Sequence, residues 1–296
     1  MNKKLLFSIL ALVLTIADMD AQRHELGVRV GHSNLVGDIG RTNYILQMPF
    51  RDVSTFGLPV YGGLLYRMNF NPHQTLRFDL GYNHIQFADG AAKEEYRYNR
   101  KMWGTNDIYE ASAIFEYNFF PVNNEQQRGM ISPYIFAGVG AMMHDVTQAT
   151  MSHDFRRDVN GVAQAPVNEL DFNSTIEYDS GKKVTGYVPF GVGLKYKFNY
   201  NWAISAEVMF RPTISEQLDY SMLKEKDLKS TFNADILSPN TNTSLLQTGY
   251  YYAVAQERER DFLYRRKVGD PNSKDWINSV TLAVTYSFGR PPCYCD

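Results

Sequence analysis

The chain has 296 residues, of which 30 are basic and 32 acidic, so its formal net charge at pH 7 is −2. This balance argues against a nucleic-acid-binding protein, which would carry an excess of basic residues. Aromatic residues are frequent, with 20 Tyr, 18 Phe and 3 Trp.

The N-terminus has the layout of a secretory signal peptide. Lys3 and Lys4 precede an apolar run from Leu5 to Ala17, and Ala21 offers a cleavage point. A basic start, a short apolar segment and a small residue before the cut are the three parts of such a signal, and the apolar segment is too short to span a membrane as a helix. We expect residues 1–21 to be a signal peptide and the rest of the chain to be exported.

Eight segments of the exported chain alternate between apolar residues and small or polar ones. In the last segment Val280, Leu282 and Val284 alternate with Thr281 and Ala283. A period of two predicts β-strands. The eight segments cover residues 25–31, 60–70, 76–83, 109–119, 132–143, 188–198, 202–211 and 280–288.

The two faces of these strands differ in size as well as in polarity. One face carries Phe, Tyr, Leu and Trp, and the other carries Gly, Ser, Ala and charged residues. A narrow lumen suits small and paired charged residues, whereas a lipid-facing belt suits large apolar and aromatic ones. The pattern predicts an all-β protein, an eight-stranded antiparallel transmembrane β-barrel of the outer-membrane type with its apolar face towards lipid. The other interpretation is a soluble lipocalin-like barrel or sandwich with the apolar face inward.

Short and long connections alternate along the chain. The short ones are "NFNPHQT" (69–75), "PVNNEQQRGMIS" (121–132) and "NYN" (199–201), and the others are long, polar and charged. Outer-membrane barrels have short periplasmic turns and long external loops. With an even number of strands, both termini of the barrel (22–289) and the tail (290–296) are expected in the periplasm. The last long loop contains a segment, residues 245–267, that we expect to form a short helix.

Six basic and five acidic residues fall on the face predicted to line the lumen. In a barrel of eight strands these charges must pair, because an unpaired buried charge is costly, and the pairs would plug the interior. We expect an ion-pair network and no conducting pore. The residues are Arg29, Arg67, Arg77, Lys195, Lys197 and Arg211, with Glu25, Asp79, Glu110, Glu116 and Glu207.

The sequence offers no arrangement typical of an enzyme. His32 and Ser33 are adjacent and would point to opposite faces of a strand, and His144, His153 and Asp154 fall near or in a loop. No metal-ligand spacing and no nucleophile motif is present. We expect no enzymatic activity, no cofactor and no small-molecule substrate. Two other functions remain open: a small barrel hydrolase or acyltransferase acting on lipopolysaccharide, and an adhesin or receptor that works through its external loops.

Five blocks of the sequence resemble, in order, those of the PorG family. They are "ELGVRVGHSNLVGDIG" (25–40), "GLLYRMNFNPHQTLRFDLGY" (63–82), "IYEASAIFEYNFF" (108–120), "SPYIFAGVG" (132–140) and "VPFGVGLKYKF" (188–198). "SNLVGDIG" together with "YRMNFNP" is the most distinctive part. Such proteins are outer-membrane barrels of the type IX (Por) secretion system, which exports proteins and supports gliding motility.

The resemblance implies a non-enzymatic component, integral to the outer membrane, that links this membrane to a periplasmic ring. The ring partners would be a PorK-like lipoprotein and a PorN-like subunit. The family offers no catalytic residue to carry over. The glycines and Asp38 of "GDIG" are interpreted as a tight turn.

The two cysteines of the chain, Cys293 and Cys295, lie in the tail beyond Pro291 and Pro292. In the oxidising periplasm they would seldom stay reduced. A bond across one intervening residue is strained and therefore easily exchanged. We expect an intermolecular disulfide with a periplasmic ring protein, first of all the PorK-like lipoprotein. The alternatives are a Cys293–Cys295 bridge and thiols that stay free or are capped by a small molecule.

Overall fold

The computed structural model describes residues 23–40, 57–123, 129–155, 172–199, 201–232, 245–270 and 273–289. The expected signal peptide (1–21) and the tail with Cys293 and Cys295 lie outside these residues. Most of the described chain is β-strand, so the predicted all-β class is confirmed.

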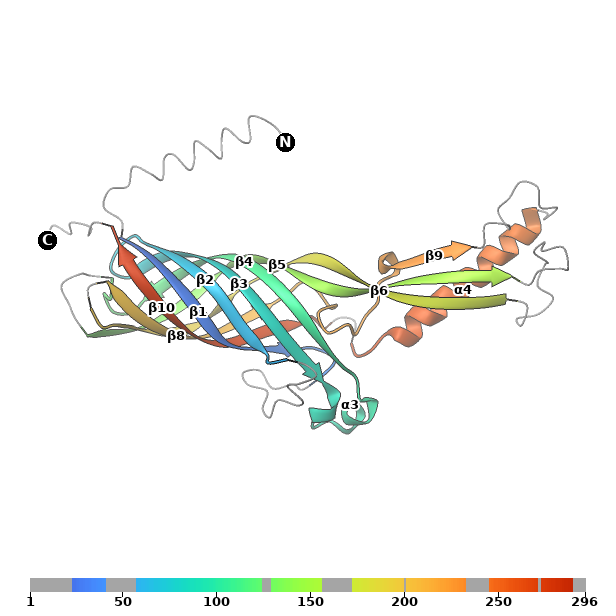
Figure 1. Cartoon of the computed structure of the whole chain (residues 1–296), viewed down its shortest axis with the longest axis horizontal. Coiled ribbons are helices and arrows are strands. Elements are labelled where there is room, and N and C mark those ends of the chain that lie inside the picture. The colour runs from blue at the N-terminus through green and yellow to red at the C-terminus, as the bar shows by residue number, and fades with distance from the viewer. Residues whose placement is uncertain are drawn as a thin grey trace, which may run out of the picture.

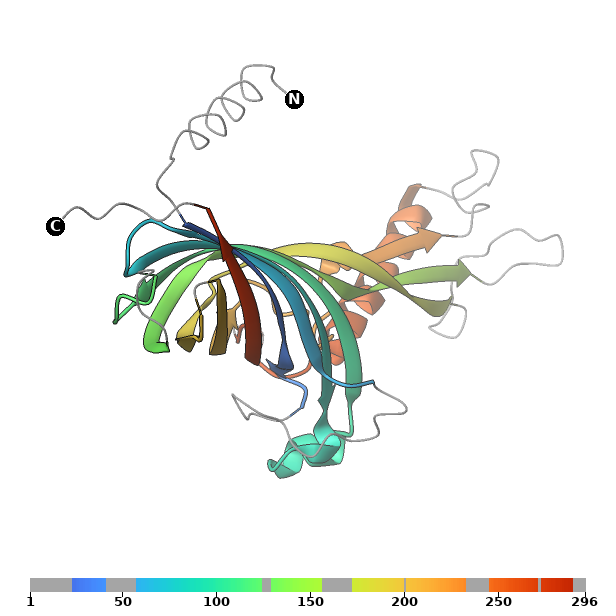
Figure 2. The same cartoon turned by 60° about the vertical axis from the view of Figure 1, so that its left-hand side comes forward.

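Eight strands pair into a closed ring. Their order is β4-β3-β2-β1-β10-β8-β7-β5, and an additional pairing between β4 and β5 joins the two ends of this order. All pairings within the ring are antiparallel, and Figures 1 and 2 show the strands curving round a common interior. The strands are β1 (Arg23–Val36), β2 (Val60–Asn69), β3 (Gln74–Ala88), β4 (Trp103–Asn118), β5 (Met130–Phe155), β7 (Phe190–Lys197), β8 (Trp202–Pro212) and β10 (Trp276–Phe288).

The ring turns its apolar face outward. In β1, Leu26, Val28 and Val30 are 57%, 56% and 63% exposed, whereas Glu25 and Arg29 between them are 4% and 1% exposed. The same alternation runs along β10, where Leu282 and Val284 are exposed and Ala283 is buried. Aliphatic and aromatic side chains therefore cover the outside, as contact with lipid requires, and polar ones fill the inside.

Short turns join β2 to β3, β4 to β5 and β7 to β8 at one end of the barrel. Asn71 Oδ1 accepts bonds from the amides of His73 and Gln74, and Asn199 Oδ1 accepts them from Asn201 and Trp202. Such side-chain bonds to the backbone two and three residues on stabilise tight turns. The described chain also begins and ends here, because His24 pairs with Phe288. We call this the short-turn end and the opposite one the long-loop end.

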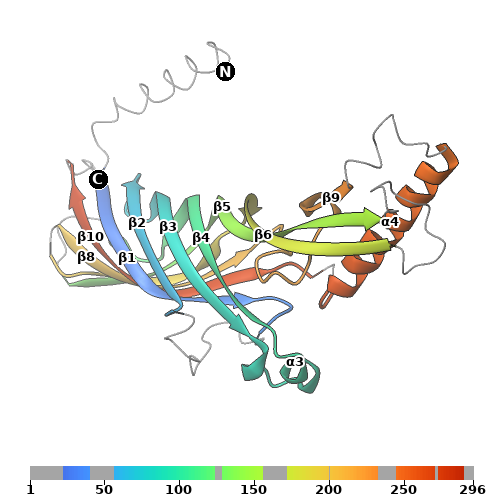
Figure 3. The same cartoon turned by 45° about the vertical axis from the view of Figure 1, so that its right-hand side comes forward.

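The connection expected to be a loop between the fifth and sixth strands is largely a β-hairpin. Strand β5 runs on for 26 residues and β6 (Phe172–Tyr187) pairs with its second half, so the hairpin projects beyond the barrel (Figure 3). A short parallel strand, β9 (Leu228–Phe232), pairs with the other edge of β5. The expected helix is present as α4 (Leu245–Arg266). We call this projecting part of β5, together with β6, β9 and α4, the appendage.

Smaller elements lie in the loop between β3 and β4 and in the segment just before β9. The loop between β3 and β4 carries η1 (Asp89–Ala91) and α3 (Glu95–Arg100), and η3 (Glu225–Asp227) precedes β9. Asp89 accepts a bond from the amide of Gly40, and Arg100 donates to the carbonyl of Asp38. These bonds hold the "GDIG" turn against α3, consistent with a structural role for its residues.

An apolar cluster closes the long-loop end. It combines side chains from five strands of the ring and from β6 with Ile39 and with Leu218, which lies in the segment after β8. Leu218 is fully buried, its amide donates to Asp275 Oδ2, and its carbonyl accepts a bond from Asn106 Nδ2. Residues 213–223, expected in an external loop, thus fold into the mouth of the barrel. The cluster consists of Leu35, Ile39, Ile85, Phe87, Ile108, Met142, Tyr187, Leu218 and Ile277.

Candidate functional site

Glu207 on β8 is the hub of the charges inside the barrel. Its carboxylate accepts bonds from Arg29 Nη1 at 2.9 Å, Arg67 Nη2 at 3.2 Å and Arg77 Nη1 at 2.8 Å. The side chain of Glu207 has no exposed surface, and those of the three arginines are at most 1% exposed. Charge-assisted bonds of this kind are stronger than neutral ones, so one carboxylate ties β8 to β1, β2 and β3.

Two further carboxylates share the same arginines. Glu116 on β4 bonds Arg67 Nε at 2.9 Å and also contacts Arg77. Asp79 on β3 accepts a bond from Arg29 Nη2 at 2.7 Å and lies 3.1 Å from Arg77 Nε. The central layer of the lumen is therefore a network in which every one of these carboxylates faces more than one guanidinium group.

The remaining predicted residues lie towards the two ends. Arg211 Nη1 bonds Glu110 Oε1 at 2.6 Å on the long-loop side. Near the short-turn end, Glu25 Oε2 lies 3.6 Å from both Arg67 Nη1 and Lys195 Nζ. Lys197 is buried at the same end. We call these eleven inward residues the lumen network: Glu25, Arg29, Arg67, Arg77, Asp79, Glu110, Glu116, Lys195, Lys197, Glu207 and Arg211.

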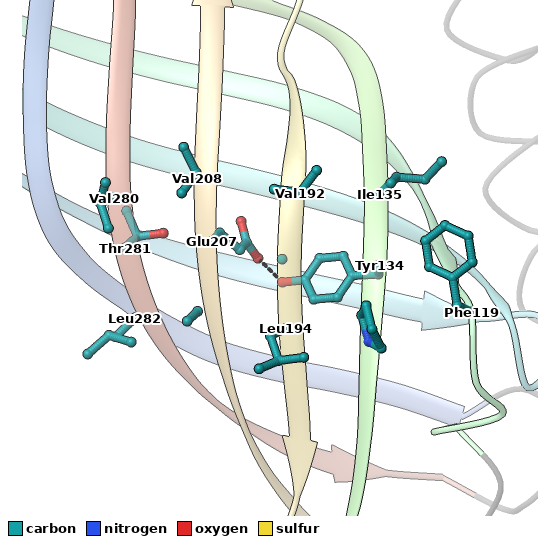
Figure 4. Close-up of a pocket in the computed structure, with 13 residues that line it drawn as sticks. Phe119, Tyr134, Ile135, Val192, Leu194, Glu207, Val208, Val280, Thr281 and Leu282 are labelled. Atoms are coloured by element: carbon teal, nitrogen blue, oxygen red, sulfur yellow. Dashed lines mark hydrogen bonds between the residues drawn. The ribbon is translucent and has the colours of Figure 1, made fainter. Parts of the chain in front are cut away.

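The network also includes two tyrosines. The pattern of charged residues in the sequence did not identify them. Tyr134 on β5 donates to Glu207 Oε1 at 2.6 Å (Figure 4), and Tyr61 on β2 accepts a bond from Arg29 Nη2 at 2.7 Å. The guanidinium carbons of Arg29 and Arg211 lie 4.9 and 5.3 Å from the centre of the Tyr61 ring. Arginine over an aromatic face is favourable, so Tyr61 links the central layer to the Arg211–Glu110 pair.

A sequence signal for the inward aromatic rings does exist, in the glycines opposite them. Tyr134 pairs with Gly193 and Phe136 with Gly191. A Cβ at Gly193 would lie 2.3 Å from Tyr134 Cζ, and one at Gly191 would lie 2.7 Å from Phe136 Cζ. The alternate glycines of "FGVGLK" leave the space that large rings on the neighbouring strand fill.

The wall formed by β5, β7, β8 and β10 has a shallow apolar hollow of about 450 Å³. Exposed outward side chains such as Ile135, Val192, Leu194 and Leu282 line it. Figure 4 shows Val192 and Leu194 on β7, the strand that the Tyr134–Glu207 bond crosses, with Ile135 and Leu282 to either side. The exposed lining is mostly aliphatic, which suits the acyl chain of a lipid.

The histidines considered as catalytic candidates have separate partners. His32 Nδ1 bonds the Pro59 carbonyl, whereas Ser33 points inward and donates to Asn83, so the two lie on opposite faces. His153, in contrast, lies between Ser174 Oγ at 2.9 Å and Glu259 Oε1 at 3.1 Å.

The His153 contacts join three elements of the appendage, namely β5, β6 and α4. Burial lowers the pKa of His153, so the ring is neutral at pH 7 and can accept a bond on one nitrogen while it donates on the other. The arrangement fastens α4 to the hairpin. It also has the residue types of a serine–histidine–acid array.

The described part of the chain contains neither of two simple features, a metal-binding cluster and a membrane-spanning helix. No group of three or more His, Cys, Asp or Glu side chains there is arranged to hold a metal ion. None of the helices within the described ranges is long and apolar enough to cross a membrane.

Residues 3–166, more than half of the chain, match the family described as "Domain of unknown function (DUF6089)". The chain belongs to the DUF6089 family. The DUF6089 match ends beyond β5, so it takes in the first five strands of the ring. No curated protein matches the sequence.

Solved structures similar to this DUF6089 chain include an outer-membrane protein of Yersinia pestis and a β-barrel domain from Pseudomonas aeruginosa. Ail, the attachment invasion locus protein of Yersinia pestis, in complex with the heparin analogue sucrose octasulfate, is 11% identical, with a TM-score of 0.39 over 90% of this chain and 99% of Ail. The N-terminal β-barrel domain of Pseudomonas aeruginosa OprF is 11% identical, with a TM-score of 0.33 over 91% of this chain and 98% of that domain. The fold of this member of the DUF6089 family is established by its strand pairing.

Proposed function

We propose that this protein is a non-enzymatic barrel of the outer membrane that anchors the periplasmic PorK/PorN ring of a type IX secretion machine. The observation that carries the proposal is the filled lumen. Glu207 and three arginines, all at most 1% exposed, occupy its centre, and the apolar cluster closes the long-loop end. A barrel without a water-filled path is suited to anchoring and not to conduction.

The sequence resemblance supports the same role. The most distinctive block, "SNLVGDIG" (33–40), ends in the turn that Asp89 and Arg100 hold in place. The expected signal peptide and the apolar outer face support an outer-membrane location, in which the short-turn end would face the periplasm. A ring in the periplasm would then contact the short turns and the tail with Cys293 and Cys295.

Affinity purification from solubilised cell envelopes tests the proposal. The tag belongs in an exposed position of the appendage, away from the short-turn end, and a tagged unrelated eight-stranded barrel serves as the control. We expect the PorK-like lipoprotein and the PorN-like subunit to co-purify with this protein and not with the control. Recovery of neither protein from cells that secrete normally would contradict the proposal.

An enzyme acting on lipopolysaccharide is the second candidate, and the contacts of His153 with Ser174 and Glu259 favour it. In this alternative the Ser174 hydroxyl is the nucleophile and the neutral imidazole accepts its proton. Incubating the purified protein with lipid A decides the matter. Turnover that disappears in Ser174→Ala would replace the anchoring role with a catalytic one.

An adhesin or receptor function would reside in the appendage. Deleting residues 148–179 together with 228–266 removes most of the appendage and keeps the buried segment 213–223 in the mouth. An adhesin loses its function in this variant, whereas a periplasmic anchor retains secretion.

A further inference from the structure

We propose that β6 is a docking edge for a second copy of this chain, whose own β6 pairs with it in antiparallel orientation about Ser180. This contact lies at the opposite end of the molecule from the ring-binding surface proposed above and is independent of it. Beyond the barrel, β6 pairs with β5 on one side. In the described part of the chain the only pairing on its other side is the bridge between Tyr187 and Thr213.

The direction of the backbone groups follows from the bonds at the base of the strand. The Gly186 carbonyl accepts a bond from Ile214 and the Val188 amide donates to the Pro212 carbonyl, both on the side away from β5, whereas the Pro189 carbonyl faces β5. Because both groups of a strand residue point to the same side and the side alternates, the even-numbered residues from Ile176 to Val184 direct N–H and C=O towards the open edge. A long edge of this kind is a template for another strand.

The side chains of β6 are largely exposed, although α4 contacts one face of the strand, where Phe262 and Arg266 lie against the ring of Tyr178. From Thr175 to Ser180 every residue is exposed, and Ile176, Tyr178 and Val184 are 37%, 57% and 67% exposed. The strand contains no proline, and its lysines, Lys182 and Lys183, are confined to the half near the barrel. The outer half therefore lacks the proline and lysine residues that usually protect an edge from pairing.

The sequence of β6 is complementary to itself when it is reversed. In an antiparallel pair centred on Ser180, Glu177 of one copy lies opposite Lys183 of the other. Ile176 lies opposite Val184, and Tyr178 lies opposite Lys182, which also bonds Asp145 Oδ1 at 2.8 Å within its own copy. Opposite charges, a lysine beside an aromatic ring and an apolar pair are each favourable across strands, and the twofold axis provides each of them twice.

The surroundings of Lys183 favour an added carboxylate. Burial, followed by the nearby Lys226 and Lys224, lowers the pKa of Lys183 to about 8, while Asp227 opposes the shift. The ammonium group donates to Gln217 Oε1 within its own copy and lies among other lysines. Glu177 of a second copy would add a negative charge to this region.

Antiparallel pairing also fixes how the two barrels are arranged. The hairpin extends along the long axis of the molecule, away from the barrel (Figures 1 and 3). A twofold axis perpendicular to β6 therefore points the two barrels in opposite directions. The contact would join copies in two facing membranes, such as those of neighbouring cells, and not two copies in one membrane.

Disulfide trapping in detergent tests the pairing and its register. Full-length protein with Cys293→Ser and Cys295→Ser carries one new cysteine, either Ser180→Cys or Thr175→Cys, and both positions are exposed. Residues opposite each other in a hydrogen-bonded antiparallel pair have Cα atoms about 5.5 Å apart, within disulfide reach. Two copies of position 175, in contrast, would be separated by roughly 33 Å along the strands.

We expect a reducible dimer with Ser180→Cys and none with Thr175→Cys. Parallel in-register pairing, as in one membrane, would trap both variants, and a surface that takes no second copy would trap neither. Either result overturns the inference.

A charge exchange provides the second test. Sedimentation of each variant in detergent measures how strongly it dimerises. Glu177→Lys places like charges opposite each other at both ends of the contact and should weaken dimerisation about tenfold, because facing like charges destabilise strand pairs. The double variant Glu177→Lys, Lys183→Glu restores opposite charges and should recover the dimer. No recovery in a folded double variant would contradict the proposed register.

Discussion

Replacing Glu207 by glutamine should destabilise the barrel strongly. The change keeps the size of the side chain but removes the negative charge that Arg29, Arg67 and Arg77 share at 2.8–3.2 Å. Asp79, Glu116 and Glu25 remain near these arginines but already have partners. Removing one member of a buried ion pair costs about 3–5 kcal/mol, because the other charge stays buried without compensation.

Urea unfolding of the protein in lipid vesicles measures this loss. Trp103 and Trp202 lie on the outer face, so tryptophan fluorescence reports when the barrel leaves the lipid. With m-values of about 1–3 kcal/mol per M urea, a loss of about 3–5 kcal/mol lowers the midpoint by at least about 1 M. Glu257→Gln on the exposed face of α4 is the matched control and should leave the midpoint unchanged. If Glu207→Gln unfolds at the same urea concentration as the control, the lumen network does not stabilise the barrel as argued.

Three further predictions concern the outer face, the lumen glycines and the mouth. Val284→Arg should lower the free energy of unfolding in vesicles by about 2–4 kcal/mol if this outward position lies near the bilayer centre. The control Val284→Leu should leave it nearly unchanged. Equal stability of the two variants would mean that Val284 does not face lipid. Gly193→Ala should impair folding, because its Cβ would lie 2.3 Å from Tyr134 Cζ. Gly62→Ala should fold normally, because no atom lies within 4 Å of the added Cβ. Gels that separate folded from heat-unfolded barrel measure both, and the reverse order would contradict the packing. Burial and the neighbouring Asp219 and Asp38 raise the pKa of Asp275 well above its usual value. The folded state therefore binds more protons than the unfolded state, and stability should rise as the pH falls through the folded-state pKa towards about 4, the usual range of an aspartate. Asp275→Asn should reduce this pH dependence, and an unchanged dependence in that variant would exclude Asp275 as its source.

The strands of the ring and the direction of their side chains could be predicted because the two faces of each strand lie in different surroundings. Lipid outside and a crowded polar lumen inside impose a period of two, which Leu26, Val28 and Val30 display against Glu25 and Arg29. The inward Tyr134 and Phe136 on β5 were harder to assign, because Ile135 and Val139 make the outer face of the same strand apolar as well.

The appendage and the mouth could not be predicted from local sequence. Strand β6 is exposed on both faces from Thr175 to Ser180, so no alternation marks it as a strand. In the segment after β8, Gln217 and Asp219 are polar residues typical of a loop. They are buried because distant groups complete their hydrogen bonds. Asp219 Oδ2 accepts from the amide of Ile39, and Gln217 Oε1 accepts from Lys183 Nζ.

Cross-linking in living cells tests the anchoring role most directly. A photoreactive amino acid at Asn71 or Asn199, in the short turns, is placed where the periplasmic ring should lie, and one at Glu257 on α4 provides the control at the opposite end. The account predicts adducts with the PorK-like lipoprotein or the PorN-like subunit from at least one turn position and none from Glu257. Adducts with these proteins from Glu257 alone, or from none of the three positions while secretion is intact, would contradict it.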